Sequence, residues 1–296
     1  MSQETHHPLW RSWKFWAALC GIAGASAVFV WLNGSMPRLA LFWLFGIILG
    51  VVLQRSRFCF VSAVSNCFLF RDTRLLEGVL GGLFVATIGF TFIMFRSVPD
   101  PSTGTLPIGA ILAPVGWHLV LGGVVFGFGM LLAGGCIIGN MFRIGEGGIP
   151  AMVAFLGIML GMGALQFTWP WWWNNYISHL SSVWLPAEIG WLWAVGLTLG
   201  VILILLILVR RMRYRQPSQQ CAGEPVPRRI ARTAKEILTR GWPLALGGIV
   251  LGLINIALYL SLDRPWTVTG ELMTWSQGLF SVVHLPPPAF TAVPGT

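Results

Sequence analysis

Cysteine and arginine occur together in one short segment of an otherwise apolar chain. Residues 54–60 read Gln-Arg-Ser-Arg-Phe-Cys-Phe, which places Arg55 and Arg57 just before Cys59. Two guanidinium groups can raise the local concentration of an anion at the mouth of a pathway. The alternative interpretation is that both arginines extend to lipid phosphates.

A second segment places a cysteine after a pair of glycines. Residues 133–147 read Ala-Gly-Gly-Cys-Ile-Ile-Gly-Asn-Met-Phe-Arg-Ile-Gly-Glu-Gly, with Cys136 directly after Gly134 and Gly135. Such a pair indicates either close packing of helices through small residues or a broken helix whose N-terminus faces an anion. The pattern favours packing. Four upstream glycines fit the same interpretation: Gly122, Gly123, Gly127 and Gly129.

Opposite charges follow three residues apart in the same segment. Arg143 and Glu146 are predicted to form a structural ion pair at the inner membrane boundary, with a role in a permeation gate as the alternative. Aromatic residues gather at Trp169–Trp173, where a loop at the outer interface is expected. Its tryptophans are interpreted as an aromatic belt, and a stacking platform for a ligand is the alternative.

The remaining cysteines indicate no metal centre. Cys20 and Cys67 are predicted to be small apolar fillers, and Cys221 a free thiol in a polar loop. The five cysteines contain no Cys-x-x-Cys pair and no histidine at metal-ligand spacing, which disfavours a structural zinc or a redox dithiol. No phosphate-binding loop or nucleophile elbow occurs. We therefore expect no cofactor and no enzymatic activity.

Composition decides what kind of elements must position these segments. Hydrophobic residues make up 55% of the chain and charged residues 10%, against about 25% charged in soluble domains. The net charge is +9, but nine of the nineteen Lys and Arg lie between positions 210 and 240, as in a cytoplasmic loop facing anionic lipid. This stretch lacks a binding motif, so nucleic acid is excluded as a partner.

The fold class predicted is an all-α polytopic membrane protein with re-entrant or broken helices. A membrane helix needs about 20 mostly apolar residues. Leu39–Leu53 is short enough for a half-membrane or broken helix, and Phe58–Phe70 is expected to enter the membrane and return on the same side. Seven hydrophobic spans are expected, namely Trp13–Leu32, Leu39–Leu53, Leu75–Phe95, His118–Ile138, Ile149–Phe167, Glu188–Val209 and Trp242–Leu262.

The two cysteine segments resemble the YeeE/YedE-type sulfur transport family, whose members import thiosulfate. The resemblance covers about residues 39–240, with a weaker echo at Pro265–Glu271. It implies an inverted repeat whose re-entrant helices meet at a constriction lined by cysteines. It places Cys59 and Cys136 on the substrate path, where protonated thiols would donate weak hydrogen bonds to a passing anion. The other candidate path residues are Gly134, Gly135, Asn140, Arg57, Arg143 and Glu146.

The chain departs from the family in its second half. Family members carry a second Gly-Gly-Cys segment, whereas this chain has none and shows no further hydrophobic span after Leu262. We expect a truncated gene product, with a second subunit or dimerisation as alternatives. The expected domains are a polar tail at 1–12, a membrane bundle at 13–209, a basic cytoplasmic loop at 210–241 and an incomplete second repeat at 242–296.

The leading hypothesis is uptake of a small sulfur-containing anion, most specifically thiosulfate, across a prokaryotic inner membrane. The N-terminus is expected in the cytoplasm, and the expected partners are the bilayer, a cytoplasmic sulfur-carrier protein and a second subunit. One alternative is a sulfur or selenium transfer subunit with a persulfide on Cys136, disfavoured because no histidine or second cysteine lies nearby in the sequence. The others are an inactive truncated transporter and a structural bundle, in which replacing Cys59 or Cys136 would change only stability.

Overall fold

The described part of the chain is helical and contains no strand. The computed structural model describes residues 13–103, 105–107, 110, 112–212, 242 and 244–282. Within them, six helical stretches are long and apolar enough to cross a membrane, and Leu246–Leu262 is a shorter apolar helix. An all-α polytopic membrane protein is thereby confirmed. The predicted tail 1–12, most of the predicted loop 210–241 and Cys221 lie outside the described residues.

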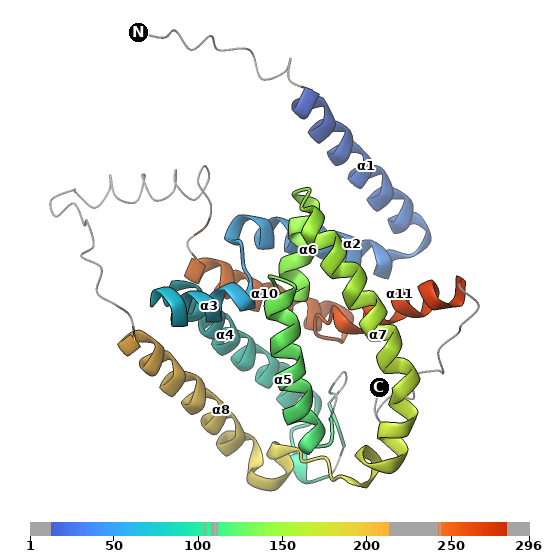
Figure 1. Cartoon of the computed structure of the whole chain (residues 1–296). Helices are drawn as coiled ribbons and strands as arrows, with labels where there is room; N and C mark the ends of the chain where they lie inside the picture. The colour runs from blue at the N-terminus through green and yellow to red at the C-terminus, as the bar shows by residue number, and fades with distance from the viewer. Residues whose placement is uncertain are drawn as a thin grey trace, which may run out of the picture. The chain divides into compact units, whose positions relative to one another are not determined.

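The chain forms two compact units, Met1–Gly50 and Val51–Thr296. Helix α1 spans Trp13–Ser35 and α2 spans Pro37–Ser56 (Figure 1). In the first unit, Trp43 Nε1 of α2 donates a hydrogen bond to the carbonyl of Ala25 on α1, at 3.1 Å. The 20 residues of α2 extend over about 30 Å, so the expectation of a half-membrane helix is wrong. Polar residues beyond Leu53 continue the helix, which the apolar pattern did not reveal.

The expected re-entrant segment forms the short helix α3, Phe60–Phe70. Its 11 residues extend over only about 16 Å, too little to cross a bilayer. The helix ends in a left-handed residue, Arg71, with φ 53°. Asp72 N then donates to the carbonyl of Asn66 at 3.1 Å, which satisfies a carbonyl that the helix end leaves free.

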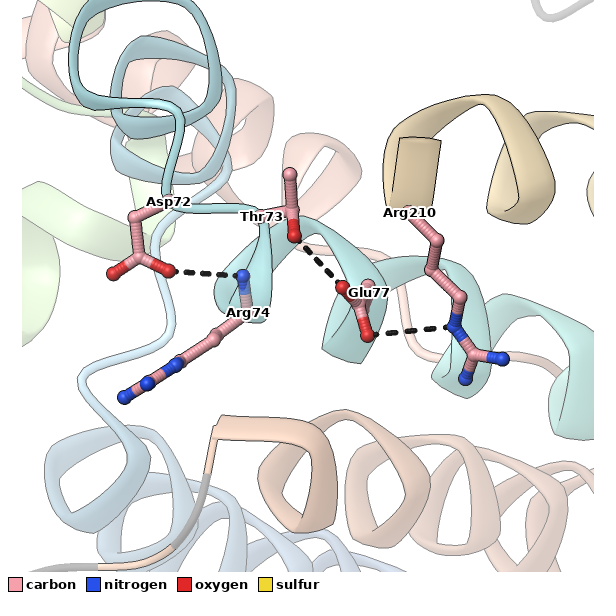
Figure 2. A network of polar contacts seen from close by, with 5 residues as sticks. All are labelled: Asp72, Thr73, Arg74, Glu77 and Arg210. Atoms are coloured by element: carbon pink, nitrogen blue, oxygen red, sulfur yellow. Dashed lines mark hydrogen bonds and ion pairs between the residues drawn. The ribbon is translucent and has the colours of Figure 1, made fainter. Parts of the chain in front are cut away.

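Helices α4 and α8 pack side by side in opposite directions (Figure 1). Helix α4 spans Arg74–Ser97 and α8 spans Leu185–Met212. Figure 2 shows Arg210, near the end of α8, paired with Glu77 in the first turn of α4, with 3.6 Å between Nε and Oε2. At the opposite ends, Trp191 Nε1 donates to the carbonyl of Val98 at 3.0 Å. Loop charges predict the same antiparallel order for these two spans.

Helix α10, Leu244–Leu262, crosses α4 through glycines on both helices. Gly78 and Gly82 face Gly248 and Gly252, so each helix presents a Gly-x-x-x-Gly pattern to the other. A Cβ at Gly252 would lie 2.7 Å from the carbonyl oxygen of Gly82, and a Cβ at Gly248 would collide with the backbone at Gly78. Small-residue packing therefore operates here, where backbones approach closely.

Helix α11, Thr269–Val282, was not expected from the sequence, which shows no long apolar run there. It packs against α7, which spans Ile149–Asn175. The buried Ser276 hydroxyl donates to the carbonyl of Met159 at 2.7 Å, and Gln166 Nε2 donates to the carbonyl of Met273 at 3.2 Å. Helix α11 is thus joined to α7 by hydrogen bonds on one face, where Leu272 and Ser276 are buried.

Helix α7 continues through the tryptophan-rich segment. Trp169–Trp173 is helical around Pro170, so the expectation of a loop is wrong. The rings of Trp169 and Trp173 stack with their centroids 6.0 Å apart, because residues four apart share one helix face. Beyond α7, the Tyr176 hydroxyl accepts a hydrogen bond from Trp117 N at 3.1 Å, which joins the end of α7 to the start of α5, Trp117–Leu132.

Candidate functional site

The span predicted at His118–Ile138 is two helices with a break at the glycine pair. Helix α5 ends at Leu132 and α6 spans Ile137–Gly145 (Figure 1). Gly134 has φ 64°, in the left-handed region that glycine adopts without strain. The helix break is therefore confirmed at Gly134 and Gly135, and the packing interpretation is wrong there. An anion at the N-terminus of the second helix stays a prediction. A Cβ added at any of the four upstream glycines would meet no atom within 4 Å, so the described residues do not pack on them either.

Cys136 caps the N-terminus of α6. Its backbone is extended, and its Sγ accepts a hydrogen bond from Gly139 N at 3.3 Å. Free N–H groups in the first turn of a helix need acceptors, and an N-cap side chain supplies one. The remaining free N–H groups and the helix dipole leave a partial positive charge beside the thiol.

Cys59 occupies the corresponding position at α3. It is the N-cap residue of that helix, with extended backbone and 1% of its surface exposed. The turn before it is made by Arg57, which has φ 47° and is exposed. Phe58 N donates to the carbonyl of Leu53 at 3.4 Å, which closes the end of α2.

The structure brings the two thiols together. Cys59 Sγ and Cys136 Sγ lie 3.9 Å apart, although 77 residues separate them in the chain. The N-termini of α3 and α6 thus converge on one pair of sulfur atoms. Each terminus contributes a partial charge of roughly +0.5. The sequence places no second cysteine beside Cys136, whereas the fold brings Cys59 next to it. That a redox dithiol is disfavoured stays a prediction.

Gly139 fits between the thiols and was not among the predicted site residues. A Cβ at this position would lie 2.7 Å from Cys59 Sγ and 3.4 Å from Cys136 Sγ. Its spacing from Cys136 could have indicated Gly139, because the residue three positions after an N-cap donates its N–H to the cap side chain.

Arg143 and Asn140 turn back from α6 toward the break. Arg143 Nη1 donates to the carbonyl of Gly134 at 2.6 Å, and Asn140 Nδ2 donates to the carbonyl of Gly135 at 3.3 Å. Side chains of a helix point toward its N-terminus, which explains this direction. The predicted ion pair with Glu146 does not form, because α6 ends at Gly145 and Glu146 is its exposed C-cap residue.

A cavity of about 1180 Å³ adjoins this side of the break. It lies between α5, α6 and α7, and most of its wall is apolar. Its polar lining includes Asn140, Arg143 and Glu146. Asn140 is fully buried and its Oδ1 has no hydrogen-bond partner. Arg57 is not among the residues that line this cavity.

The other cysteines do not join the thiol pair. Cys67 is buried within α3, in keeping with its interpretation as a filler, whereas Cys20 is exposed on α1. Among the described residues, no group of three or more His, Cys, Asp or Glu side chains could hold a metal ion. The chemistry offered by the site is therefore that of two thiols, two helix N-termini and the amide hydrogens beside them.

Comparison with known proteins relates this chain to transporters of sulfur compounds. The family model described as sulphur transport matches residues 55–290. The probable transporter YedE of Escherichia coli (strain K12) is 28% identical over 64% of this chain and 46% of its own length. The thiosulfate transporter TsuA of the same strain is 25% identical over 71% of this chain and 57% of its own length.

A more similar stretch occurs in a spirochaete protein. The thiosulfate transporter TsuA of Spirochaeta thermophila is 37% identical over 47% of this chain and 40% of its own length. The chain thus spans about half the length of the curated relatives it matches.

Proposed function

Because this chain belongs to the sulphur transport family, we propose that it moves a small sulfur-containing anion, most specifically thiosulfate, across a prokaryotic inner membrane. The observation that carries the proposal is the meeting of the α3 and α6 N-termini at the Cys59–Cys136 pair. Half-helix N-termini at membrane depth are a recurring way to stabilise an anion without a fixed cationic side chain.

The thiol pair suits an anion that must pass through the site. A thiol is a weak hydrogen-bond donor, and a passing ion must bind strongly enough to enter and weakly enough to leave. Cys59 is buried and Cys136 is partly exposed, so an anion would reach Cys136 first from the exposed side. Gly134 supplies the left-handed turn that places Cys136 at the N-terminus of α6, because glycine adopts this backbone without strain.

Loop charges set the proposed orientation. Arg55, Arg57, Arg71 and Arg74 follow or precede helix ends that the positive-inside rule places in the cytoplasm, together with the N-terminus. An anion leaving the thiol pair on this side would meet positive charge. Proposed partners are a cytoplasmic sulfur-carrier protein and further protein that completes the path, supplied by a second subunit or a second copy.

Uptake of labelled thiosulfate by cells that lack their own importers tests the proposal. Cys136→Ala should abolish uptake while the protein stays in the membrane, and Cys67→Ala should leave uptake unchanged because Cys67 lies outside the pair. Cells that express a full-length relative in parallel serve as the positive control. Absence of uptake by the unmutated chain, inserted at normal levels, would contradict the proposal for this chain alone.

The closeness of the thiols also favours a second candidate, sulfur transfer. A persulfide on Cys136 could be attacked by the Cys59 thiol, which would form a disulfide between the two residues and release hydrogen sulfide. A low-molecular-weight thiol would have to reduce the disulfide before the next cycle. Hydrogen sulfide release that depends on both cysteines, without net uptake of labelled anion, would favour this candidate over transport.

A further inference from the structure

The break before Cys136 is held by two side chains that come from the helix after it. Arg143 Nη1 donates to the carbonyl of Gly134, and Asn140 Nδ2 donates to the carbonyl of Gly135. These are consecutive carbonyls in a non-helical turn, where no intrahelical donor is available to them. Within a membrane bundle an unsatisfied carbonyl costs several kcal/mol, so both bonds matter to the shape of the turn.

The two side chains also lie over the turn. A Cβ at Gly135 would be 3.4 Å from Asn140 Oδ1 and 3.5 Å from Arg143 Nη1. Gly135 and Asn140 are buried. The amide orientation of Asn140 follows from the Gly135 carbonyl, because the opposite orientation would place two acceptor oxygens against each other. Turn and helix are therefore fixed to one another on the side of the break that faces the cavity.

From these contacts we infer that Asn140 and Arg143 are positioning residues, which set the direction of Cys136 Sγ toward Cys59 rather than contacting the anion themselves. The inference rests on the proposed function and deepens it, since both residues were first expected on the substrate path. Asn140 acts through the Gly135 carbonyl, next to Cys136. Arg143 acts through the Gly134 carbonyl. Its guanidinium makes a charge-assisted hydrogen bond there, which is stronger than a hydrogen bond between neutral groups.

Disulfide formation measures the thiol geometry without any transport. The other three cysteines, Cys20, Cys67 and Cys221, are replaced by alanine, so that only the pair remains. Diamide then takes one hydrogen from each thiol, is reduced to the hydrazide, and leaves a Cys59–Cys136 disulfide. Its rate of formation reports how often the sulfur atoms approach bonding distance.

Asn140→Leu and Arg143→Met remove the donors at similar side-chain size. Each should slow disulfide formation about tenfold, as expected for a lost hydrogen bond that holds the turn. Arg143→Lys should restore most of the rate, because its ammonium group can still donate to Gly134. Met141→Leu on the same helix is the matched control and should leave the rate unchanged. Labelled thiosulfate uptake should show a lower maximal rate at an unchanged half-saturating concentration.

Two results would overturn the inference. One is an unchanged disulfide rate in both donor variants. The other is a raised half-saturating concentration for thiosulfate in both donor variants, which would place the two residues in contact with the anion. Should either variant fail to accumulate, Gly134→Asn and Gly134→Val replace them: Asn tolerates left-handed backbone and Val does not, so a turn-controlled pair must oxidise faster in the former. If disulfide rates follow the inference but the unmutated chain transports nothing, only the proposed function fails.

Discussion

Gly139 faces the sulfur of Cys59 so closely that a methyl group at Gly139 would lie 2.7 Å from it. The same methyl group would lie 3.4 Å from Cys136 Sγ. The thiol pair therefore depends on a missing side chain as much as on the cysteines. The Cys59 side chain cannot move away from the added methyl group, because Cys59 is buried and its backbone caps α3.

Gly139→Ala should force the thiols apart. Overpacking of this kind costs about 1–3 kcal/mol, and we expect thiosulfate uptake to fall about tenfold or more while the protein still inserts. Gly145→Ala is the control on the same helix, because a Cβ at Gly145 meets nothing within 4 Å. Uptake rates normalised to the amount of protein in the membrane check the prediction, and equal loss in both variants would contradict it.

Mercuric ion should block the site by bridging the two thiols. Soft metal ions prefer thiolate ligands, and two ligands on one protein bind as a chelate, so we expect block at roughly a hundredfold lower concentration than for a single thiol. Cys59→Ser and Cys136→Ser should each remove the high-affinity phase. Cys20→Ser should retain it, because Cys20 is exposed on α1 and outside the pair. Titration of the purified protein with mercuric ion measures this, because binding can be followed in variants that no longer transport. A high-affinity phase that survives loss of Cys59 would refute the bridge.

The close crossing of α4 and α10 should depend on its glycines. Gly248→Ala places a methyl group against the backbone at Gly78, so we expect a loss of about 1–3 kcal/mol and a lower unfolding temperature in detergent. Gly81→Ala on α4 is the matched control, since Gly81 has open space around it. An unfolding temperature that is the same in the two variants would show that the helices do not cross here.

The polar network in Figure 2 should stabilise the fold through the hydrogen bond from the buried Thr73 hydroxyl to Glu77 rather than through the ion pair of Glu77 with Arg210. Arg210 is 69% exposed at its side chain, so Glu77→Gln should cost about 0–1 kcal/mol, with little further loss in high salt. Glu77→Leu should cost more, about 1–3 kcal/mol, because the fully buried Thr73 loses the acceptor that its hydroxyl reaches at 2.7 Å. Unfolding in detergent at low and high salt separates the two contributions. Equal destabilisation by both variants would assign the energy to the ion pair instead.

Local patterns determined which residues belong to membrane helices and which segments were chemically unusual. Long apolar runs predicted α1, α4 and α8 to within about three residues at each end, since apolar length governs insertion. For α7 they predicted the start but not the continuation to Asn175. Cys59 and Cys136 were chosen from their glycine and arginine neighbours. Helix α11 was missed because residues 269–282 contain no long apolar run, and its hydrogen bonds to α7 join residues more than 100 positions apart.

The sequence by itself thus determined the class of protein, most of the long apolar helices and the two cysteine segments, because these follow from apolar length and residue type. Only the tertiary structure decided that the glycine pair breaks a helix, that Arg143 binds a carbonyl instead of Glu146, and that the sulfur atoms of Cys59 and Cys136 lie 3.9 Å apart. The physical reason is that each of these depends on where distant backbone groups come to lie. A carbonyl freed by a turn, or a helix end aimed at another, acquires its partner only when the chain is folded.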